Sequence, residues 1–187
     1  MNNEYSKYND NELVAAMADR SSSEGAFREL YNRYSSMVHA YCMKITGDEE
    51  ITDDIFQETF IRFYRKIDPK LDNLNVKAFL IKIAKNLCIN HNKLKKNNIP
   101  IDQAKNILRV SQDYEQRELL ELLDLSLGML DDEFREAFVL REYAGMSYKD
   151  IADTCDISEN NAKSRVFRAK KKIKEILKPY IKDIIDN

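Results

Sequence analysis

Hydrophobic residues recur through the first half of the chain with the period of an α-helix. From residue 27 they fall at i, i+3, i+4, i+7, i+10, i+11 and i+14, which places them on one face of a long helix. They are Phe27, Leu30, Tyr31, Tyr34, Met37, Val38 and Tyr41. The same period predicts two further helices, over about 49–66 and about 76–95. Gly47 suits the end of the first helix, and Pro69 ends the second.

The helical period lapses over residues 97–116, which contain Pro100 and several Asn and Gln residues. Such a stretch is typical of a linker. The period resumes near Tyr114 and continues to Pro179, which is expected to stop the last helix. Four glycines and three prolines in 187 residues provide few turns for an all-β fold.

We therefore predict an all-α protein of two small helical domains. The first covers 10–96 and the second 115–180, joined by a flexible linker over 97–114. The first nine residues and the last few are expected to fray.

The second domain contains the pattern of a helix-turn-helix. A helix over 131–142 precedes a turn at Gly145, and Ser147 then opens an S-x-x-D capping box. The short helix that follows ends at Asp156, which tolerates a left-handed turn, and Ser158 caps a longer helix. A short helix, a tight turn and a longer helix are the parts of a helix-turn-helix.

The longer helix has one apolar face and one face rich in hydrogen-bond donors. Ala162, Val166, Ala169 and Ile173 repeat at i, i+4, i+7 and i+11 and are predicted to face the domain. The opposite face presents Asn160, Asn161, Lys163, Ser164, Arg165, Phe167, Arg168 and Lys171. These side chains suit base edges and phosphates in a major groove. The alternative is a basic helix face that is simply solvated. DNA binding is favoured by three features found together: the capping signals, the tight turn and the small Ala152 at the helix crossing.

A second basic segment lies at the end of the first domain. Residues 82–98 include five lysines and no acid, with Asn86 and Asn90 among them and Phe79 one turn ahead. Aromatic and amide groups beside lysines suit single-stranded nucleic acid, whose bases stack or enter pockets. A solvated, lysine-rich helix end, stabilised by the helix dipole, explains the same residues equally well.

Acidic and basic residues are clustered in separate segments, although the net charge is only −2 and the pI is about 5.8. Residues 159–178 contain eight Lys or Arg and two Glu, a local charge of +6. Residues 48–58 contain six acids and no base, and residues 113–136 contain nine acids and two Arg. The acidic clusters are expected to meet a basic protein partner or to shield the basic faces in the free chain.

Other features narrow the class of protein. No apolar run approaches the roughly 18 residues of a membrane span, and the N-terminus lacks the pattern of a signal peptide, so we expect a cytoplasmic protein without membrane insertion. Cys42, Cys88 and Cys155 are far apart and are expected to be buried thiols. With two histidines and no CxxC pair, no metal site and no cofactor are expected. No P-loop or other catalytic motif is present, so no enzyme is expected.

Three motifs in order resemble those of the extracytoplasmic-function (ECF) group of sigma-70-like sigma factors of bacterial RNA polymerase. "DDIFQETFIRFYRKI" is similar to the family's D-x-x-Q-E-x-F-x-R motif, and "AFLIKIAKNLCINHNK" to its W-L-x-x-I-A-x-N segment. "MSYKDIADTCDISENNAKSRVFRAKKKI" resembles its C-terminal helix-turn-helix with the K-S-R-x-x-R-A core. The resemblance covers about 26–177.

The resemblance implies three sets of site residues. Contacts with the β′ clamp of the core polymerase are expected from Asp54, Gln57, Glu58, Phe60, Ile61 and Arg62. Contacts with the minus-10 element are expected from Phe79, Lys82, Lys85, Asn86, Asn90 and Lys93. Contacts with the minus-35 element are expected from Asn160, Asn161, Lys163, Ser164, Arg165, Arg168 and Lys171.

Two departures from the family pattern affect promoter choice. Phe79 stands where the family usually has Trp, and "ENNAK" replaces the common x-G-T-V-K entry to the recognition helix. Asn160 and Asn161 suit adenine contacts, so promoter preference does not follow from relatives.

The implied function is that of a sigma factor, which directs promoter-specific initiation by recognising minus-35 duplex and by melting and capturing the minus-10 element. The implied partners are the core polymerase, through its β′ clamp and β flap, promoter DNA and an anti-sigma factor. The main alternative is a one-component DNA-binding regulator, which needs an N-terminal ligand or receiver domain. A helical scaffold or adaptor is a further alternative.

Overall fold

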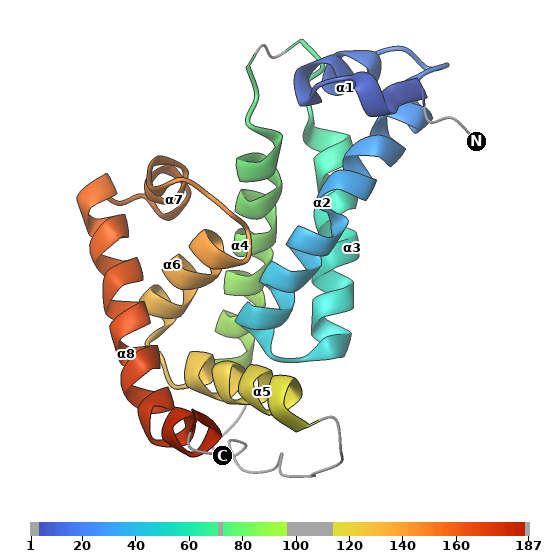
Figure 1. Cartoon of the computed structure of the whole chain (residues 1–187). Helices are drawn as coiled ribbons and strands as arrows, with labels where there is room; N and C mark the ends of the chain where they lie inside the picture. Colours follow the sequence, from blue (N-terminus) through green and yellow to red (C-terminus); the bar gives the residue numbers. More distant parts are fainter. Residues whose placement is uncertain (1–3, 71–72, 97–113, 186–187) are drawn as a thin grey trace. The chain divides into compact units, whose positions relative to one another are not determined.

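The structure is a computed structural model that describes residues 4–70, 73–96 and 114–185. Within these ranges the chain forms a 3-10 helix and eight α-helices and no strand, which confirms the predicted all-α class (Figure 1). The chain divides into two compact units, Met1–His91 and Asn92–Asn187. The predicted linker, 97–114, lies outside the described residues except for Tyr114.

The first unit is a helical bundle. Its elements are η1 (Glu4–Lys7), α1 (Asp10–Ala16), α2 (Ser23–Thr46), α3 (Glu49–Lys66) and α4 (Val76–Lys96). Helices α2 and α3 form an antiparallel pair (Figure 1), and Gly47 ends α2 in the left-handed region with φ 66°. The Asp48 carboxylate then caps α3 by accepting the N–H of Ile51 at 3.1 Å. The helices over 49–66 and from residue 76 are confirmed.

Helix α4 is fixed in this bundle by side chains from both neighbours. The rings of Phe63 on α3 and Phe79 on α4 lie 6.1 Å apart. Cys42 on α2 and Cys88 on α4 are both buried, with their thiols in hydrogen-bond contact. The hydrogen bond with Cys88, together with burial, raises the pKa of Cys42 far above the ordinary value for a thiol. The prediction of a buried thiol is confirmed at both positions.

The N-terminal segment, which was expected to fray, is attached to α2. The Arg33 guanidinium donates to the backbone carbonyl of Tyr8 at 2.7 Å and to the Asp10 carboxylate at 3.1 Å. Gly25 lets the Tyr5 ring lie against α2, since a Cβ there would be 2.3 Å from Tyr5 Cε2. The expectation of fraying was therefore wrong for residues 4–9, because contacts with α2 outweigh the freedom of a chain end.

The second unit consists of α5 (Tyr114–Gly128), α6 (Asp132–Glu142), α7 (Tyr148–Cys155) and α8 (Glu159–Ile185). Helix α8 packs against the other three. Its apolar residues join those of α5 and α6 in one core, made by Leu127, Leu130, Phe134, Phe138, Ala169, Ile173 and Leu177. The predicted helix over 131–142 begins one residue later, because Asp131 is its N-cap.

Two predictions about this unit were wrong. Helix α8 does not stop at Pro179 but continues to Ile185. A proline inside a helix loses one backbone hydrogen bond and clashes with the carbonyl four residues earlier, at a cost of about 3 kcal/mol or more. The buried Leu177 just before it anchors the helix to the core and helps to offset that cost. Cys155 is half-buried and not buried, and its Sγ lies 3.6 Å from a Glu136 carboxylate oxygen on α6.

Candidate nucleic-acid interface

The helix-turn-helix of the second unit is fixed by local hydrogen bonds. Ser147 Oγ accepts the N–H of Asp150 at 3.1 Å, and the Asp150 carboxylate accepts the N–H of Ser147 at 3.2 Å, which completes a capping box. Helix α7 ends at Asp156, which has φ 55°. Ser158 Oγ then accepts the N–H of Asn161 at 3.2 Å and caps α8. The predicted caps and turn are confirmed.

The orientation of α8 follows from its apolar face. Ala162, Val166, Ala169 and Ile173 are all buried, as their spacing predicts. Because these residues face the core, the opposite face of α8 lies open to solvent. Of the residues expected at the minus-35 element, Asn160, Asn161, Lys163, Arg168 and Lys171 are exposed and Ser164 is half-buried.

Arg165 differs from the other residues of that set. Its guanidinium is paired with the Glu133 carboxylate of α6 at 2.7 Å, and 20% of its side chain is exposed. Lys170 pairs with Glu142 at 2.8 Å and Lys172 with Asp131 at 2.6 Å. These pairs join α8 to α6 and its N-cap, so part of the acidic cluster over 113–136 neutralises bases within its own unit.

The contact with Lys172 affects the ionisation of the Asp131 carboxyl. Its hydrogen bond with Lys172, and then the charge of that lysine, hold the Asp131 pKa below its usual value. The lysine side chain also lies over the Phe134 ring, with its Nζ 5.0 Å from the ring centroid. These contacts attach the later part of α8 to the start of α6.

The basic face of the first unit lies along α4. Lys82, Asn86 and Asn90 follow one another at i, i+4 and i+8 and are exposed on one face of the helix, while Lys85 is half-buried. Phe79 is half-buried against Phe63 and stands at the start of this face. Lys93 belongs to α4, but its side chain lies outside the described residues.

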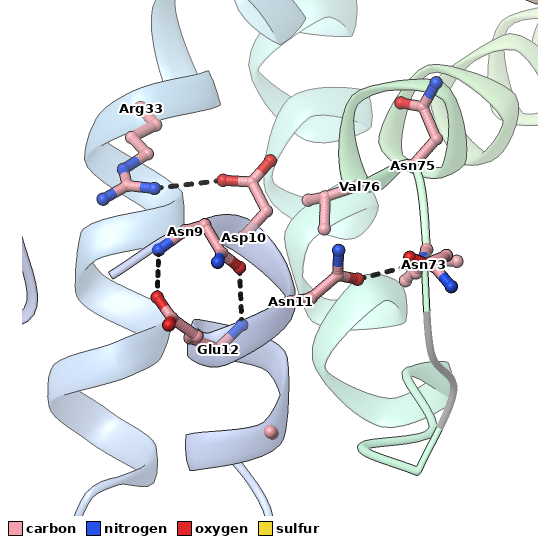
Figure 2. Close-up of a pocket in the computed structure, with 10 residues that line it drawn as sticks. Asn9, Asp10, Asn11, Glu12, Arg33, Asn73, Asn75 and Val76 are labelled. Atoms are coloured by element: carbon pink, nitrogen blue, oxygen red, sulfur yellow. Dashed lines mark hydrogen bonds and ion pairs between the residues drawn. The ribbon is translucent and has the colours of Figure 1, made fainter. Parts of the chain in front are cut away.

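A polar pocket opens between the beginning of α1 and the connection that precedes α4 (Figure 2). Its volume is about 760 Å³, and four asparagines line it: Asn9, Asn11, Asn73 and Asn75. Asn11 Oδ1 accepts the N–H of Leu74 at 2.9 Å, and Asn75 Oδ1 accepts the N–H of Ala78 at 3.0 Å. No sequence pattern predicted this pocket, although the run "DNLNV" at the start of α4 contains two of the asparagines that line it.

An apolar groove separates the exposed edges of α2 and α3. It has a volume of about 650 Å³ and is lined by Phe27, Tyr31, Phe56, Phe60, Ile61 and Tyr64, together with Glu24, Gln57 and Arg65. The Phe27 and Tyr64 rings lie 5.1 Å apart, and those of Tyr31 and Phe60 4.8 Å apart. Ile61 and Tyr64 are 43% and 48% exposed, which leaves apolar surface open to a partner.

The groove includes half of the residues expected at the β′ clamp. Gln57, Phe60 and Ile61 line it, whereas Asp54 is exposed and Glu58 is paired with Arg62 at 2.6 Å. Four aromatic residues of the groove were not expected there: Phe27, Tyr31, Phe56 and Tyr64. The helical spacing of Phe27 and Tyr31 predicted one hydrophobic face, and no sequence signal distinguishes a covered aromatic face from a half-open one.

Neither a metal cluster nor a membrane span is found among the described residues. No group of three or more His, Cys, Asp or Glu side chains there could hold a metal ion. None of the helices in that part of the chain has the length and apolar character needed to cross a membrane.

Comparison with known proteins identifies the family. The family model described as sigma-70 region 2 matches residues 30–97, and that described as sigma-70, region 4 matches residues 116–173. The ECF RNA polymerase sigma factor SigM of Bacillus subtilis (strain 168) is 30% identical over 159 residues, which cover 83% of this chain and 97% of SigM. The chain belongs to the ECF sigma factors of RNA polymerase. As such it is a transcription initiation factor that directs promoter-specific initiation.

Other relatives support the assignment of this sigma factor. RNA polymerase sigma factor SigZ of Bacillus subtilis (strain 168) is 24% identical over 153 residues, covering 80% of this chain and 85% of SigZ. The fold is similar to that of sigma factor RpoE from Bartonella quintana, solved in complex with the anti-sigma factor NepR. That match has a TM-score of 0.70 and 24% identity and covers 81% of this chain and 96% of RpoE. CnrH, solved with the cytosolic domain of CnrY, matches with a TM-score of 0.64 and 23% identity, covering 91% of this chain and 97% of CnrH.

Proposed function

We propose that the two units divide the work of promoter recognition. The second unit places α8 in the major groove of the minus-35 duplex, and α4 of the first unit captures the unpaired strand of the minus-10 element. The observation that supports this most is the basic face of α8, which is open to solvent. The opposite, apolar face of the helix consists of Ala162, Val166 and Ala169, which are buried in the core. Two weak contacts on one chain raise the overall affinity through effective concentration.

The minus-35 contact rests on the outward residues of α8. Asn160 and Asn161, in the first turn of the helix, offer amides that suit adenine, and Lys163 and Lys171 offer positive charge to phosphates. Arg165 is expected to act indirectly, because its pair with Glu133 holds α8 against α6. The remaining members of the set, Ser164 and Arg168, lie beside these residues on the helix.

The minus-10 contact rests on α4 and on the pocket before it. Lys82, Asn86 and Asn90 offer charge and amides along one face, with Phe79 at its start and Lys85 and Lys93 completing the basic segment. Capturing unstacked bases offsets the cost of opening the duplex, which is a few kcal/mol per flipped base. The amides of Asn11 and Asn73 in the pocket extend this polar surface beyond the first turn of α4.

The core polymerase is the proposed partner of the groove between α2 and α3. A partner helix that presents apolar side chains fits a groove with exposed Tyr31, Ile61 and Tyr64. In this proposal the β′ clamp supplies that helix, and the β flap holds the second unit. In this proposal the polymerase catalyses RNA synthesis, so the chain itself is not an enzyme and needs no cofactor. The chain acts in the cytoplasm, where the chromosome lies.

An anti-sigma factor is a further proposed partner. RpoE of Bartonella quintana was solved with the anti-sigma factor NepR. A regulator of that kind would act on this chain by covering the groove, α4 or α8 and thereby blocking the polymerase or the DNA.

Run-off transcription on a pool of genomic fragments tests the proposal, with bacterial core polymerase and the full chain. Transcripts that start a fixed distance from a shared two-part motif are the expected result. The contrary result is duplex binding without such transcripts, which would favour a one-component regulator. Tight binding of the free full-length chain to promoter duplex would also count against the proposal, because the two units are expected to be aligned only in the polymerase.

A further inference from the structure

A hydrogen bond attaches the segment that leads into α4 to the N-terminal helix α1. Asn11 Oδ1 on α1 accepts the backbone N–H of Leu74 at 2.9 Å, from a residue 63 positions away in the sequence (Figure 2). Asn73 and Asn75, on either side of Leu74, are exposed and line the same polar pocket as Asn11. The bond therefore joins the two sides of the pocket.

Residues 73–75 depend on such an anchor because their conformation is unfavourable by itself. Asn73 has φ 61°, in the left-handed region, which costs free energy for residues other than glycine, although asparagine tolerates it better than most. None of the three side chains is buried, whereas Val76, the first residue of α4, is 1% exposed. A hydrogen bond to the Leu74 N–H thus favours this conformation where core packing does not.

Helix α1 gives the Asn11 side chain a fixed support. Asn9 Oδ1 accepts the N–H of Glu12 at 3.0 Å, and the Glu12 carboxylate accepts the N–H of Asn9 at 2.6 Å, so a capping box holds the first turn. Leu13 and Val14 are 0% exposed, so α1 cannot rotate without exposing apolar surface. The acceptor oxygen is therefore held in place from both ends of the helix.

We propose that Asn11 is a positioning residue for the capture of the minus-10 strand. It holds residues 73–75 in one conformation at the start of the α4 face that begins with Phe79. Such ordering favours binding, because apparent affinity falls with the fraction of molecules in the competent conformation. The inference rests on the proposed function and adds to it an indirect role for α1, in which Asn11 acts through Leu74.

The rate of promoter opening tests this role. The full chain with core polymerase, at saturating concentration, opens a promoter found by run-off transcription, and permanganate detects unpaired thymines in its minus-10 element. Asn11→Ala removes the acceptor and is expected to slow opening about two- to fivefold, the effect of losing one hydrogen bond. Asn32→Ala is the matched control, because it removes an exposed asparagine of α2 outside the pocket, and should open the promoter at the parental rate.

Two further measurements separate positioning from a general loss of stability. In NMR hydrogen exchange of the free full chain, the Leu74 amide should exchange faster in Asn11→Ala than in the parent. Asn11→Asp keeps an acceptor oxygen at the same place and should restore both the protection of that amide and the rate of opening. Because rates are taken at saturating holoenzyme, an effect of the added charge on DNA affinity does not enter. Thermal unfolding checks that all variants fold as the parent does.

Three results would overturn the inference alone. The first is an unchanged exchange rate of the Leu74 amide in Asn11→Ala. The second is faster exchange of that amide with a parental rate of opening. The third is an Asn11→Asp holoenzyme that protects Leu74 and still opens the promoter as slowly as Asn11→Ala. If the parent holoenzyme opens no promoter at all, the proposed function fails, and the inference fails with it.

Discussion

At the scale of single residues, five basic side chains of α8 fall into two groups. Arg165, Lys170 and Lys172 pair with acids at the start and end of α6, whereas Lys163 and Lys171 form their ion pairs within α8, at i,i+4. Lys163 also lies over the Tyr148 ring of α7, 5.8 Å from its centroid. The ion pairs of the first group stabilise the second unit. The lysines of the second group can give up their weak ion pairs within α8 and bind DNA phosphates instead. Residue type alone does not separate the groups.

Replacing Arg165 tests this division. Arg165→Ala should lower the free energy of unfolding of the second unit by about 0.5–1 kcal/mol, because it breaks the link between α8 and Glu133. Lys163→Ala should change stability by less than about 0.5 kcal/mol and still weaken DNA binding by the holoenzyme. Thermal unfolding and filter binding of both variants give the comparison. The division would be wrong if Arg165→Ala weakened DNA binding with no loss of stability.

Two helical glycines should respond in opposite ways to alanine. At Gly25 a Cβ would lie 2.3 Å from the Tyr5 ring, so Gly25→Ala should displace the N-terminal segment and destabilise the first unit by about 1 kcal/mol. At Gly128 no atom lies within 4 Å of the added Cβ, so Gly128→Ala should stabilise α5 by about 0.5–1 kcal/mol. Urea unfolding measures both changes in the free energy of unfolding. If both substitutions changed stability in the same direction, the packing of Tyr5 on α2 would be contradicted.

At the scale of elements, the position of α4 depends on contacts with α2 and α3. Phe79 packs on Phe63, and Cys88 contacts Cys42. These contacts decide which face of α4 remains open, and thus place Lys82 and Asn86 outward. Because the Cys42 thiol is buried in this contact, alkaline pH should weaken the packing between α2 and α4.

The expected pH dependence follows from the raised pKa of Cys42. In the unfolded chain this thiol ionises near pH 8.5, but in the folded chain it stays neutral to higher pH. Its contribution to stability is therefore complete below about pH 8.5 and is lost as pH rises, by at most about 1.4 kcal/mol per pH unit.

Urea unfolding between pH 7 and pH 9.5 measures this slope at pH values below the ordinary tyrosine pKa of about 10. Cys42→Ala should be less stable at pH 7, because it loses packing, yet its stability should fall less steeply toward pH 9.5. If the stability of Cys42→Ala fell with pH as steeply as that of the parent, groups other than Cys42 would cause the loss of stability at alkaline pH.

At the scale of the whole molecule, each unit has a surface of its own. The groove between α2 and α3 belongs to the first unit, and the face of α8 to the second. In the proposed function one surface holds the polymerase and the other holds DNA. Changes to the two surfaces should therefore affect different steps of initiation.

A pair of variants separates these steps. Ile61→Asp places a charge in the apolar groove and should weaken binding to core polymerase at least tenfold, about 1.4 kcal/mol, without unfolding an exposed position. Ser36→Asp adds the same charge to an exposed position of α2 outside the groove and is the control. A Lys163→Ala, Lys171→Ala chain should bind core polymerase normally and fail to select promoters. Binding to core polymerase is measured by fluorescence anisotropy. If Ile61→Asp bound core polymerase normally, the polymerase contact would lie outside the groove.

The sequence by itself determined the main helices, the caps of the helix-turn-helix and the family. Helical period, the capping box at Ser147 and the left-handed residue at Asp156 depend on neighbours within a few positions, so they can be read from the chain. The tertiary structure decided which of these faces are covered. The pairing of Arg165 with Glu133, the half-open aromatic face at Tyr31 and the attachment of Tyr5 at Gly25 join residues from different elements. Periodicity shows which side chains share a face, and only packing between elements shows what that face meets.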